Sequence, residues 1–303
     1  MDVGKPSFDQ LQIFLAVVDE GSFNRAALKL GRAISAISYN IANLEAQLGV
    51  RLFERAGSRR PELTEAGKAL VAEARNLSDG MDDLVAKVRS LQQGLEAELA
   101  LAVDVMVPGH LLAELLRDFQ SAYPTVALRL NVEALGAVAA LLLDGQASLA
   151  IAGPDVVDHP ELERRLIGSV ELVPVAAPTH PLAQLETIQS GEVRKHLQLV
   201  LTDRSKLTEG REFSVFSPRT WRLADLGAKH DLLKEGLGWG HMPRHIVERD
   251  IKEGILKRLT LPERTGIDFE LNALWRKDAP PGPAASWVLA EIKQRLMRMA
   301  QHG

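Results

Sequence analysis

The feature that most constrains the fold is a set of apolar residues that repeats every seven positions in the first third of the chain. Leucine recurs at Leu63, Leu70, Leu77, Leu84 and Leu91. A second set, offset by four positions, consists of Ala74, Met81, Val88 and Leu95. This spacing places the side chains in a narrow stripe along one helix, as in a coiled coil. The pattern predicts a long helix that Thr64 can cap and that continues to about Leu95.

A helix with so narrow an apolar stripe needs a second helix to cover it. We therefore expect this segment to make a dimer of the chain through six heptad residues: Leu70, Leu77, Met81, Leu84, Val88 and Leu91. The alternative is that the stripe packs against the body of its own chain.

Three shorter helices are predicted before the heptad segment. Apolar residues spaced three and four apart predict helices over 8–20 and 34–48, and Ser22 is a good N-cap for a helix over 23–30. Glycines that follow these segments end the helices. A short helix, a tight turn containing glycine and a second amphipathic helix make a helix-turn-helix unit.

The third of these helices has an apolar and a polar face. Its apolar residues are Ile34, Ile37, Ile41, Leu44 and Leu48. The opposite face carries small or hydrogen-bonding side chains, namely Ser35, Ala36, Tyr39, Asn40 and Asn43, with Ser38 at its margin. Asparagine can pair with adenine, and small residues let a helix sit deep in the major groove of DNA. The face predicts a base-reading surface; the alternative is an ordinary polar face on a three-helix core.

A β-hairpin, or wing, is predicted over 50–63, with two short extended stretches around the turn Ala56-Gly57-Ser58. The segment from Arg51 to Arg60 holds four arginines against Glu54 alone, although the whole chain has a net charge of −4. Arginines in such a wing contact phosphates and hold the helix in register without reading sequence.

From Glu96 onward, strands and helices alternate. Strands are predicted over 99–105, 126–132, 149–152, 171–177, 197–201 and 269–275, and helices over 108–123, 137–143, 223–235 and 286–300. Such alternation predicts a mostly parallel α/β sheet, in which ligands bind near the carboxyl ends of the strands.

The length of 303 residues suits two or three domains. No apolar run reaches the roughly 20 residues that span a bilayer, and the polar start has no apolar signal core, so we expect no membrane partner and no export. The absence of cysteine excludes disulfides, thiolate zinc sites and cysteine catalysis, and it fits a cytoplasmic location.

Three ordered blocks of sequence strongly resemble the LysR-type transcriptional regulators. The blocks are Ser22-Phe23-Asn24-Arg25-Ala26-Ala27, Leu44-Glu45-x-x-Leu48-Gly49-Val50-Arg51-Leu52-Phe53-Glu54-Arg55 and Leu63-Thr64-Glu65-Ala66-Gly67. A weaker resemblance continues through Phe119-x-x-x-Tyr123-Pro124, Leu142-x-Asp144-Gly145, Ala177-Pro178-x-His180-Pro181-Leu182 and Gly236-x-Gly238-x-Gly240-x-Met242-Pro243.

The resemblance implies a regulator with three parts: a winged helix-turn-helix over 1–63, a linker and dimerisation helix over 64–95, and a two-lobed α/β effector domain, like the periplasmic binding proteins, over 96–303. The implied partners are double-stranded DNA, a small-molecule effector and other copies of the chain in a homotetramer, with RNA polymerase as a further candidate. No cofactor is implied.

The same resemblance assigns site residues. DNA contacts are expected from Ser22, Asn24, Arg32, Ile34, Ser35, Ser38, Tyr39, Asn40, Arg55, Arg59 and Arg60. Effector contacts are expected from Asp104, Val105, Met106, Val107, Glu133, Thr202, Arg204, Ser205, Trp221 and His241.

Two residues depart from the family's pattern. Ala33 stands where the family usually has Ser or Thr opening the recognition helix, which removes an N-cap worth about 1 kcal/mol. Asp104 stands where the family often has Ser or Thr at the effector, and its charge favours a small, non-anionic effector rich in hydrogen-bond donors. The alternative is that Asp104 caps the following turn or pairs with Arg204 or Arg222.

An enzyme is a competing interpretation, but the chain has no P-loop, no Gly-x-Ser-x-Gly elbow and no His-Glu-x-x-His motif. His241 and His245 are spaced for one helical face, but Pro243 between them disturbs the helix that they need, and we expect no metal site. A solute-binding protein with an unrelated N-terminal extension is a second alternative. The wing and the lack of a signal segment argue against it.

Overall fold

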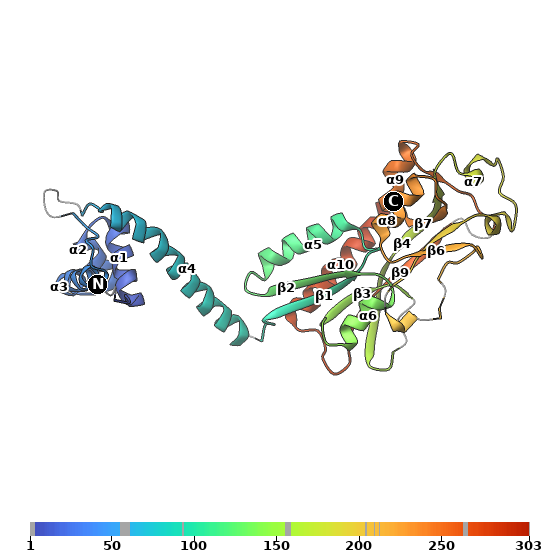
Figure 1. The fold of residues 1–303 in the computed structure, drawn as a ribbon. Helices are drawn as coiled ribbons and strands as arrows, with labels where there is room; N and C mark the ends of the chain where they lie inside the picture. Colours follow the sequence, from blue (N-terminus) through green and yellow to red (C-terminus); the bar gives the residue numbers. More distant parts are fainter. Residues whose placement is uncertain are drawn as a thin grey trace. The chain divides into compact units, whose positions relative to one another are not determined.

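The computed structural model describes residues 4–54, 61–92, 94–154, 159–203, 205–208, 210–211, 213–262 and 266–302. The chain forms two compact units, Met1–Arg89 and Ser90–Gly303 (Figure 1).

The first unit is helical, as predicted. It contains α1 (Phe8–Glu20), α2 (Phe23–Leu30), α3 (Ile34–Leu48) and most of α4 (Glu65–Gln92). Ser22 caps α2 by accepting a hydrogen bond from the Arg25 amide at 3.5 Å. Ala33, at the N-cap of α3, makes no side-chain capping bond, as its departure from the family's pattern predicts.

The core of the first unit lies between α1, α2 and α3. Phe14 and Phe23 each meet the Phe53 ring edge-on, with centroids 5.6 Å apart. Ile37 and Leu44 of α3 are fully buried in this core. Ile34, the first residue of α3 and a predicted DNA contact, is half exposed, although it continues the apolar period of the helix.

The predicted hairpin begins where α3 ends. Phe53 and Leu63 form an antiparallel bridge, and the Glu54 amide donates to the Glu62 carbonyl at 2.8 Å. The tip of the wing, residues 55–60, falls outside the residues that the structure describes.

The start of α4 is fixed against the hairpin. Thr64 caps it, because its Oγ1 accepts from the Gly67 amide at 3.0 Å and donates to the Arg51 carbonyl at 2.6 Å. A Cβ on Gly67 would lie 2.2 Å from the Leu52 carbonyl oxygen, so only glycine allows this approach.

The second unit is an α/β fold around one sheet. Its strands are β1 (Glu98–Asp104), β2 (Ala127–Glu133), β3 (Leu149–Ala152), β4 (Leu162–Ala176), β5 (Gln198–Leu201), β6 (Thr220–Leu223), β7 (Trp239–Pro243), β8 (Lys257–Arg258) and β9 (Ile267–Arg276). Its helices are α5 (Gly109–Ala122), α6 (Gly136–Leu143), α7 (Pro181–Gln184), α8 (Leu226–Lys234), α9 (Arg244–Lys252) and α10 (Pro283–His302), with short 3-10 turns η2 (Glu192–Lys195) and η3 (Lys206–Thr208).

The sheet is mixed, which corrects the prediction of a mostly parallel sheet. Its strand order is β2-β1-β3-β9-β4-β7-β5-β6, with β8 beside β4. The pairs at either end are parallel, but β9 is antiparallel to β3 and to β4, and β4 is antiparallel to β7. The long antiparallel pair β4 and β9 thus joins two parallel groups of strands.

These two groups of strands are the centres of two lobes. In the first lobe, α5, α6 and α10 pack around β1, β2 and β3; in the second, α7, α8 and α9 accompany β5, β6 and β7 (Figure 1). Strands β4 and β9 run through both, with a β-bulge between Leu166 and Gly168. Glu96, just before β1, is linked to α10, because its carboxylate accepts hydrogen bonds from the Ala284 and Ala285 amides at the start of that helix.

Candidate DNA-binding surface and effector cavity

The outer face of α3 is exposed and carries no free charge. Ser35, Ser38 and Tyr39 are exposed, and the Tyr39 side chain is 67% exposed. Glu45 is the one charged residue of the helix, and it is directed toward the hairpin. The Asn40 amide nitrogen donates to the Ala36 carbonyl at 2.9 Å, so this side chain lies along its own helix.

The other predicted DNA contacts lie outside α3, and their side chains have different surroundings from one another. Asn24 is exposed on α2, whereas Ser22 is engaged as the cap of that helix. Both terminal nitrogens of Arg32 donate to the Asp9 carboxylate at 2.7 Å. This hydrogen bonding holds the pKa of Asp9 below its usual value and raises the pKa of Arg32. Three further predicted contacts lie outside the described residues: Arg55, Arg59 and Arg60.

The heptad stripe on α4 divides into two parts. Leu70 packs against the core of the first unit and Ala74 is fully buried in it. Beyond them the stripe is exposed, at Leu77, Met81, Leu84, Val88 and Leu91. Large apolar side chains exposed in one continuous row mark an interaction surface.

A cavity of about 360 Å³, which we call the interlobe cavity, lies in the second unit. Met106, after β1, and Leu135, after β2, contribute to its wall from the first lobe. The second lobe contributes apolar side chains of β5 and four polar residues, Gln198, Ser214, Lys229 and His241, and β9 contributes Asp268.

The predicted effector residues do not gather in one place. Met106 and His241 line the interlobe cavity. Asp104, Val105 and Val107 line a second cavity of about 420 Å³, and Glu133 and Ser205 line a third of about 490 Å³.

The remaining predicted effector residues lie outside these cavities. Trp221 is half exposed on β6, at the edge of the sheet, and the Thr202 amide donates to the Leu223 carbonyl. Arg204 lies outside the described residues.

Asp104 is fully buried and its carboxylate binds backbone amides. One oxygen accepts from the Met106 amide at 2.9 Å and the other from the Leu135 amide at 3.2 Å. Leu135 has a φ of 49°, which is unusual for a residue other than glycine, and Asp104 helps to hold it there. This geometry supports the capping alternative for Asp104 over a direct contact with an effector.

Lys229 is one of the wall residues that sequence reasoning missed. It lies on α8 between Leu226 and Leu233, and all three are buried. Its Nζ donates to the His241 carbonyl at 2.7 Å. A Cβ on Gly240 would lie 3.2 Å from the Lys229 Cε and 2.6 Å from the Leu199 carbonyl oxygen, so this glycine makes room for the lysine. Burial lowers the pKa of Lys229 to about 7.

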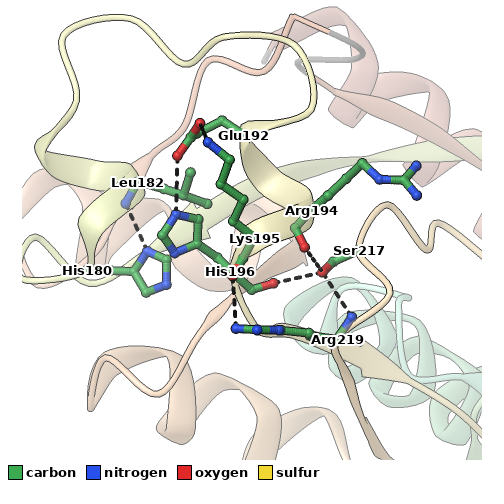
Figure 2. A network of polar contacts seen from close by, with 8 residues as sticks. All are labelled: His180, Leu182, Glu192, Arg194, Lys195, His196, Ser217 and Arg219. Carbon is green, nitrogen blue, oxygen red and sulfur yellow. Dashed lines mark hydrogen bonds and ion pairs between the residues drawn. The ribbon is translucent and has the colours of Figure 1, made fainter.

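A polar network elsewhere in the second lobe is structural. Figure 2 shows the buried His180 accepting a hydrogen bond at Nδ1 from the Leu182 amide, at 3.2 Å, which caps α7. The His180 ring lies against the His196 ring, with centroids 5.3 Å apart. Burial, with a contribution from the charge of His196, lowers the pKa of His180 to about 4. Ser217 donates to the His196 carbonyl at 2.8 Å and so holds this loop in place.

The two histidines considered for a metal lie on different elements, His241 on β7 and His245 on α9. Within the described ranges, no group of three or more His, Cys, Asp or Glu side chains is placed to hold a metal ion. Across the same ranges, no helix is long and apolar enough to cross a membrane.

Comparison with known proteins accounts for both units. The family model of the bacterial regulatory helix-turn-helix protein, lysR family, matches residues 8–68, and that of the LysR substrate binding domain matches residues 92–297. The chain is 32% identical over 291 residues to the probable HTH-type transcriptional regulator YhaJ of Escherichia coli (strain K12), covering 94% of this chain and 95% of the relative. It is 28% identical over 302 residues to the HTH-type transcriptional regulator AceR of Acinetobacter baumannii, covering 96% and 98%.

Solved structures share the fold. An OxyR mutant of Corynebacterium glutamicum aligns with a TM-score of 0.57 at 19% identity, covering 98% of this chain and 94% of that one. Full-length BenM aligns with a TM-score of 0.52 at 20% identity, covering 97% and 98%. With a helix-turn-helix unit and a two-lobed effector-binding unit both matched, the chain belongs to the LysR family of DNA-binding transcriptional regulators.

Proposed function

We propose that α3 reads the bases of the operator and that the wing holds α3 in register. The observation that carries this proposal is the exposed face of α3, where a largely exposed Tyr39 lies among serines and no exposed charge. Asn40 joins this face when its amide leaves the Ala36 carbonyl and turns toward a base. Ser22, Asn24, Arg32, Ile34 and the wing arginines are proposed to contact the DNA around it.

Selection of bound fragments from a random DNA library tests this proposal. Tyr39→Ala or Asn40→Ala is expected to relax the selected sequence and to cost roughly 1–3 kcal/mol at the contacted base pair. Arg59→Ala is expected to weaken binding to all sequences alike and to reduce its salt dependence. Arg249→Ala removes the same charge from α9 in the other unit and serves as the control. If neither α3 variant changes the selected sequence or the affinity, the reading face is misassigned.

The exposed part of the α4 stripe is proposed as the dimer contact, with a second copy of this chain as its partner. Because each helix-turn-helix unit is small, a dimer would read two half-sites related by a two-fold axis. The same proposal gives the domain limits as 1–63, 64–95 and 96–303. It also includes assembly into a homotetramer and action in the cytoplasm, where chromosomal DNA lies. RNA polymerase is a candidate partner of the DNA-bound form.

The interlobe cavity is proposed as the effector site. Its volume of about 360 Å³ lies within the range of small-molecule pockets, and residues of both lobes form its wall. An effector bound there would favour one arrangement of the lobes. Filling the cavity with Val200→Phe tests this: effector-dependent changes in DNA binding should disappear, while effector-free DNA binding should persist.

A further inference from the structure

The interlobe cavity contains a buried cation with spare hydrogen-bonding capacity. The Lys229 residue is 4% exposed, and its Nζ donates one hydrogen bond, to the His241 carbonyl. An ammonium group has three donors. Within the part of the chain that the structure describes, no carboxylate forms an ion pair with Lys229, and burial is the sole cause of its lowered pKa.

An unpaired charge is costly to bury, so a lysine in such a place is usually paired or neutral. With its pKa lowered to about 7, the Lys229 side chain is partly charged near neutral pH in the absence of a ligand. Here the residue also lines a cavity that is large enough for a ligand.

The rest of the cavity wall sets the character of the ligand. Leu172 of β4, Leu199 of β5 and Ile267 of β9 contribute apolar side chains beside the polar ones. Besides Lys229, the titratable groups among the described wall residues are His241 of β7 and Asp268 of β9. Asp268 is exposed, so water and salt screen its charge, whereas Lys229 is buried. The wall beside Lys229 is therefore suited to a negative group.

We propose that the interlobe cavity takes a small organic acid with an apolar body, whose carboxylate pairs with the Nζ of Lys229. This inference rests on the proposed effector role of the cavity and adds the chemical class of the effector. It replaces the expectation of a non-anionic effector, because Asp104, on which that expectation rested, lines a different cavity and binds backbone amides. The apolar body would lie against the leucine and isoleucine side chains, and the carboxylate would accept the two hydrogen bonds that the ammonium still has to give.

Proton uptake follows from this pairing. A carboxylate beside Lys229 favours the charged amine and raises its pKa, so binding the acid takes up a proton when the amine is neutral beforehand. Affinity for the acid should therefore fall as pH rises above about 7, by up to about tenfold per pH unit. The corresponding neutral amide should show no such dependence.

Calorimetry on the full chain, without DNA, tests the proposal with hexanoate, cyclohexanecarboxylate and benzoate, each against its amide, at pH 6.5 and 8.5. Wild type is expected to prefer at least one acid over its amide by about tenfold or more at pH 6.5, and to lose most of that preference at pH 8.5. Lys229→Met, which keeps the length of the side chain, should abolish the preference at both pH values. Lys234→Met, at the exposed ion pair with Asp231 on the same helix, should leave it unchanged.

Two results would overturn the proposal: a preference for acids that survives in Lys229→Met, or no acid that binds wild type more tightly than its amide. The pH dependence of wild type needs no variant and decides the matter if Lys229→Met fails to fold. This test of the ligand class can be distinguished from the test of the cavity as the effector site. If Val200→Phe abolishes the effector response while Lys229→Met binds acids as wild type does, the cavity is the effector site and the ligand class is wrong.

Discussion

The carboxylate of Glu45, near the end of α3, accepts a hydrogen bond from the backbone amide of Leu52 at 2.7 Å. The same oxygen accepts from the Phe53 amide at 3.2 Å. Both residues are buried and open the hairpin that leads to the wing. One side chain thus ties the proposed reading helix to the element that is proposed to hold it in register.

Glu45→Ala is therefore expected to destabilise the first unit and to weaken DNA binding. Two buried amides would lose their acceptor, at a cost of about 1–3 kcal/mol for each amide that finds no other. Glu45→Gln keeps an oxygen at this position and should recover most of the loss. Urea denaturation followed by circular dichroism measures the difference. Equal stability of Glu45→Ala and wild type would show that the bonds contribute nothing.

Because one part of the α4 stripe is packed and the other is exposed, leucine-to-alanine substitutions in the two parts are expected to affect different equilibria, namely unfolding and association. Leu77→Ala with Leu84→Ala removes side chains that are exposed in the single chain, so it should weaken association, by about 2–5 kcal/mol per site if each is buried in a dimer. Leu70→Ala removes a side chain that packs on its own unit, so it should lower the free energy of unfolding instead. Sedimentation equilibrium measures the first effect and chemical denaturation the second. Unchanged assembly after the double truncation would show that the seam is not the dimer contact.

Local signals made most of the helical unit predictable. Ser22 caps α2 and Thr64 caps α4 as their sequence neighbours indicate, because capping involves residues only a few positions apart. Ile34 continues the apolar period of α3 but is half exposed, because the period of a helix continues past the point where the core ends. The spacing of apolar residues shows on which face of a helix a residue lies. It does not show how far along the helix the core that packs on that face extends.

The sheet and the cavity depend on pairings that no local pattern reveals. Strand β9 lies between β3 and β4, although it follows them by about a hundred residues, and so the direction of the central strands was missed. The burial of Lys229 could be inferred from the sequence, since the residue lies between Leu226 and Leu233 on the apolar face of α8. That position predicts burial, but the cavity beside it is formed by residues from four strands and four connecting segments.

Gly136, at the start of α6, is expected to tolerate no side chain. A Cβ there would lie 2.4 Å from the Ser205 Oγ and 2.8 Å from an Asp203 carboxylate oxygen. That carboxylate also accepts from Ser205 at 2.8 Å, so the loop between β5 and η3 is braced against α6. Gly136→Ala should therefore lower the melting temperature and loosen the contact between the lobes.

A substitution at another helix start serves as the control. It separates the effect of this contact on stability from the effect of replacing the first residue of a helix. Gly109 is also the first residue of its helix, α5, and nothing lies within 4 Å of the place where its Cβ would be. Gly109→Ala should be neutral or slightly stabilising, since alanine restricts the unfolded chain. Differential scanning fluorimetry of the two variants makes the comparison. Similar melting temperatures for both would mean that the loop moves aside at no cost.

His180 predicts a loss of stability in acid. Its Nδ1 accepts the Leu182 amide, which requires the unprotonated ring, and burial lowers its pKa from 6.5 to about 4. Between these values the unfolded chain binds more protons than the folded one, so the stability due to the neutral ring is complete above pH 6.5 and is lost as the pH falls toward 4. His180→Asn keeps a capping acceptor that does not titrate, so its free energy of unfolding should fall less steeply over this range.

His159 provides the control for this measurement. Its Nδ1 also accepts an amide two residues ahead, from Glu161 at 3.3 Å, but its side chain is half exposed. His180 is buried, and burial is the main reason that its pKa falls. His180→Asn should depart from the wild-type dependence on pH below pH 6.5, and His159→Asn makes the same substitution at a less buried turn. Parallel curves for all three proteins, from urea denaturation at half-unit steps of pH, would show that the cap at α7 tolerates a proton.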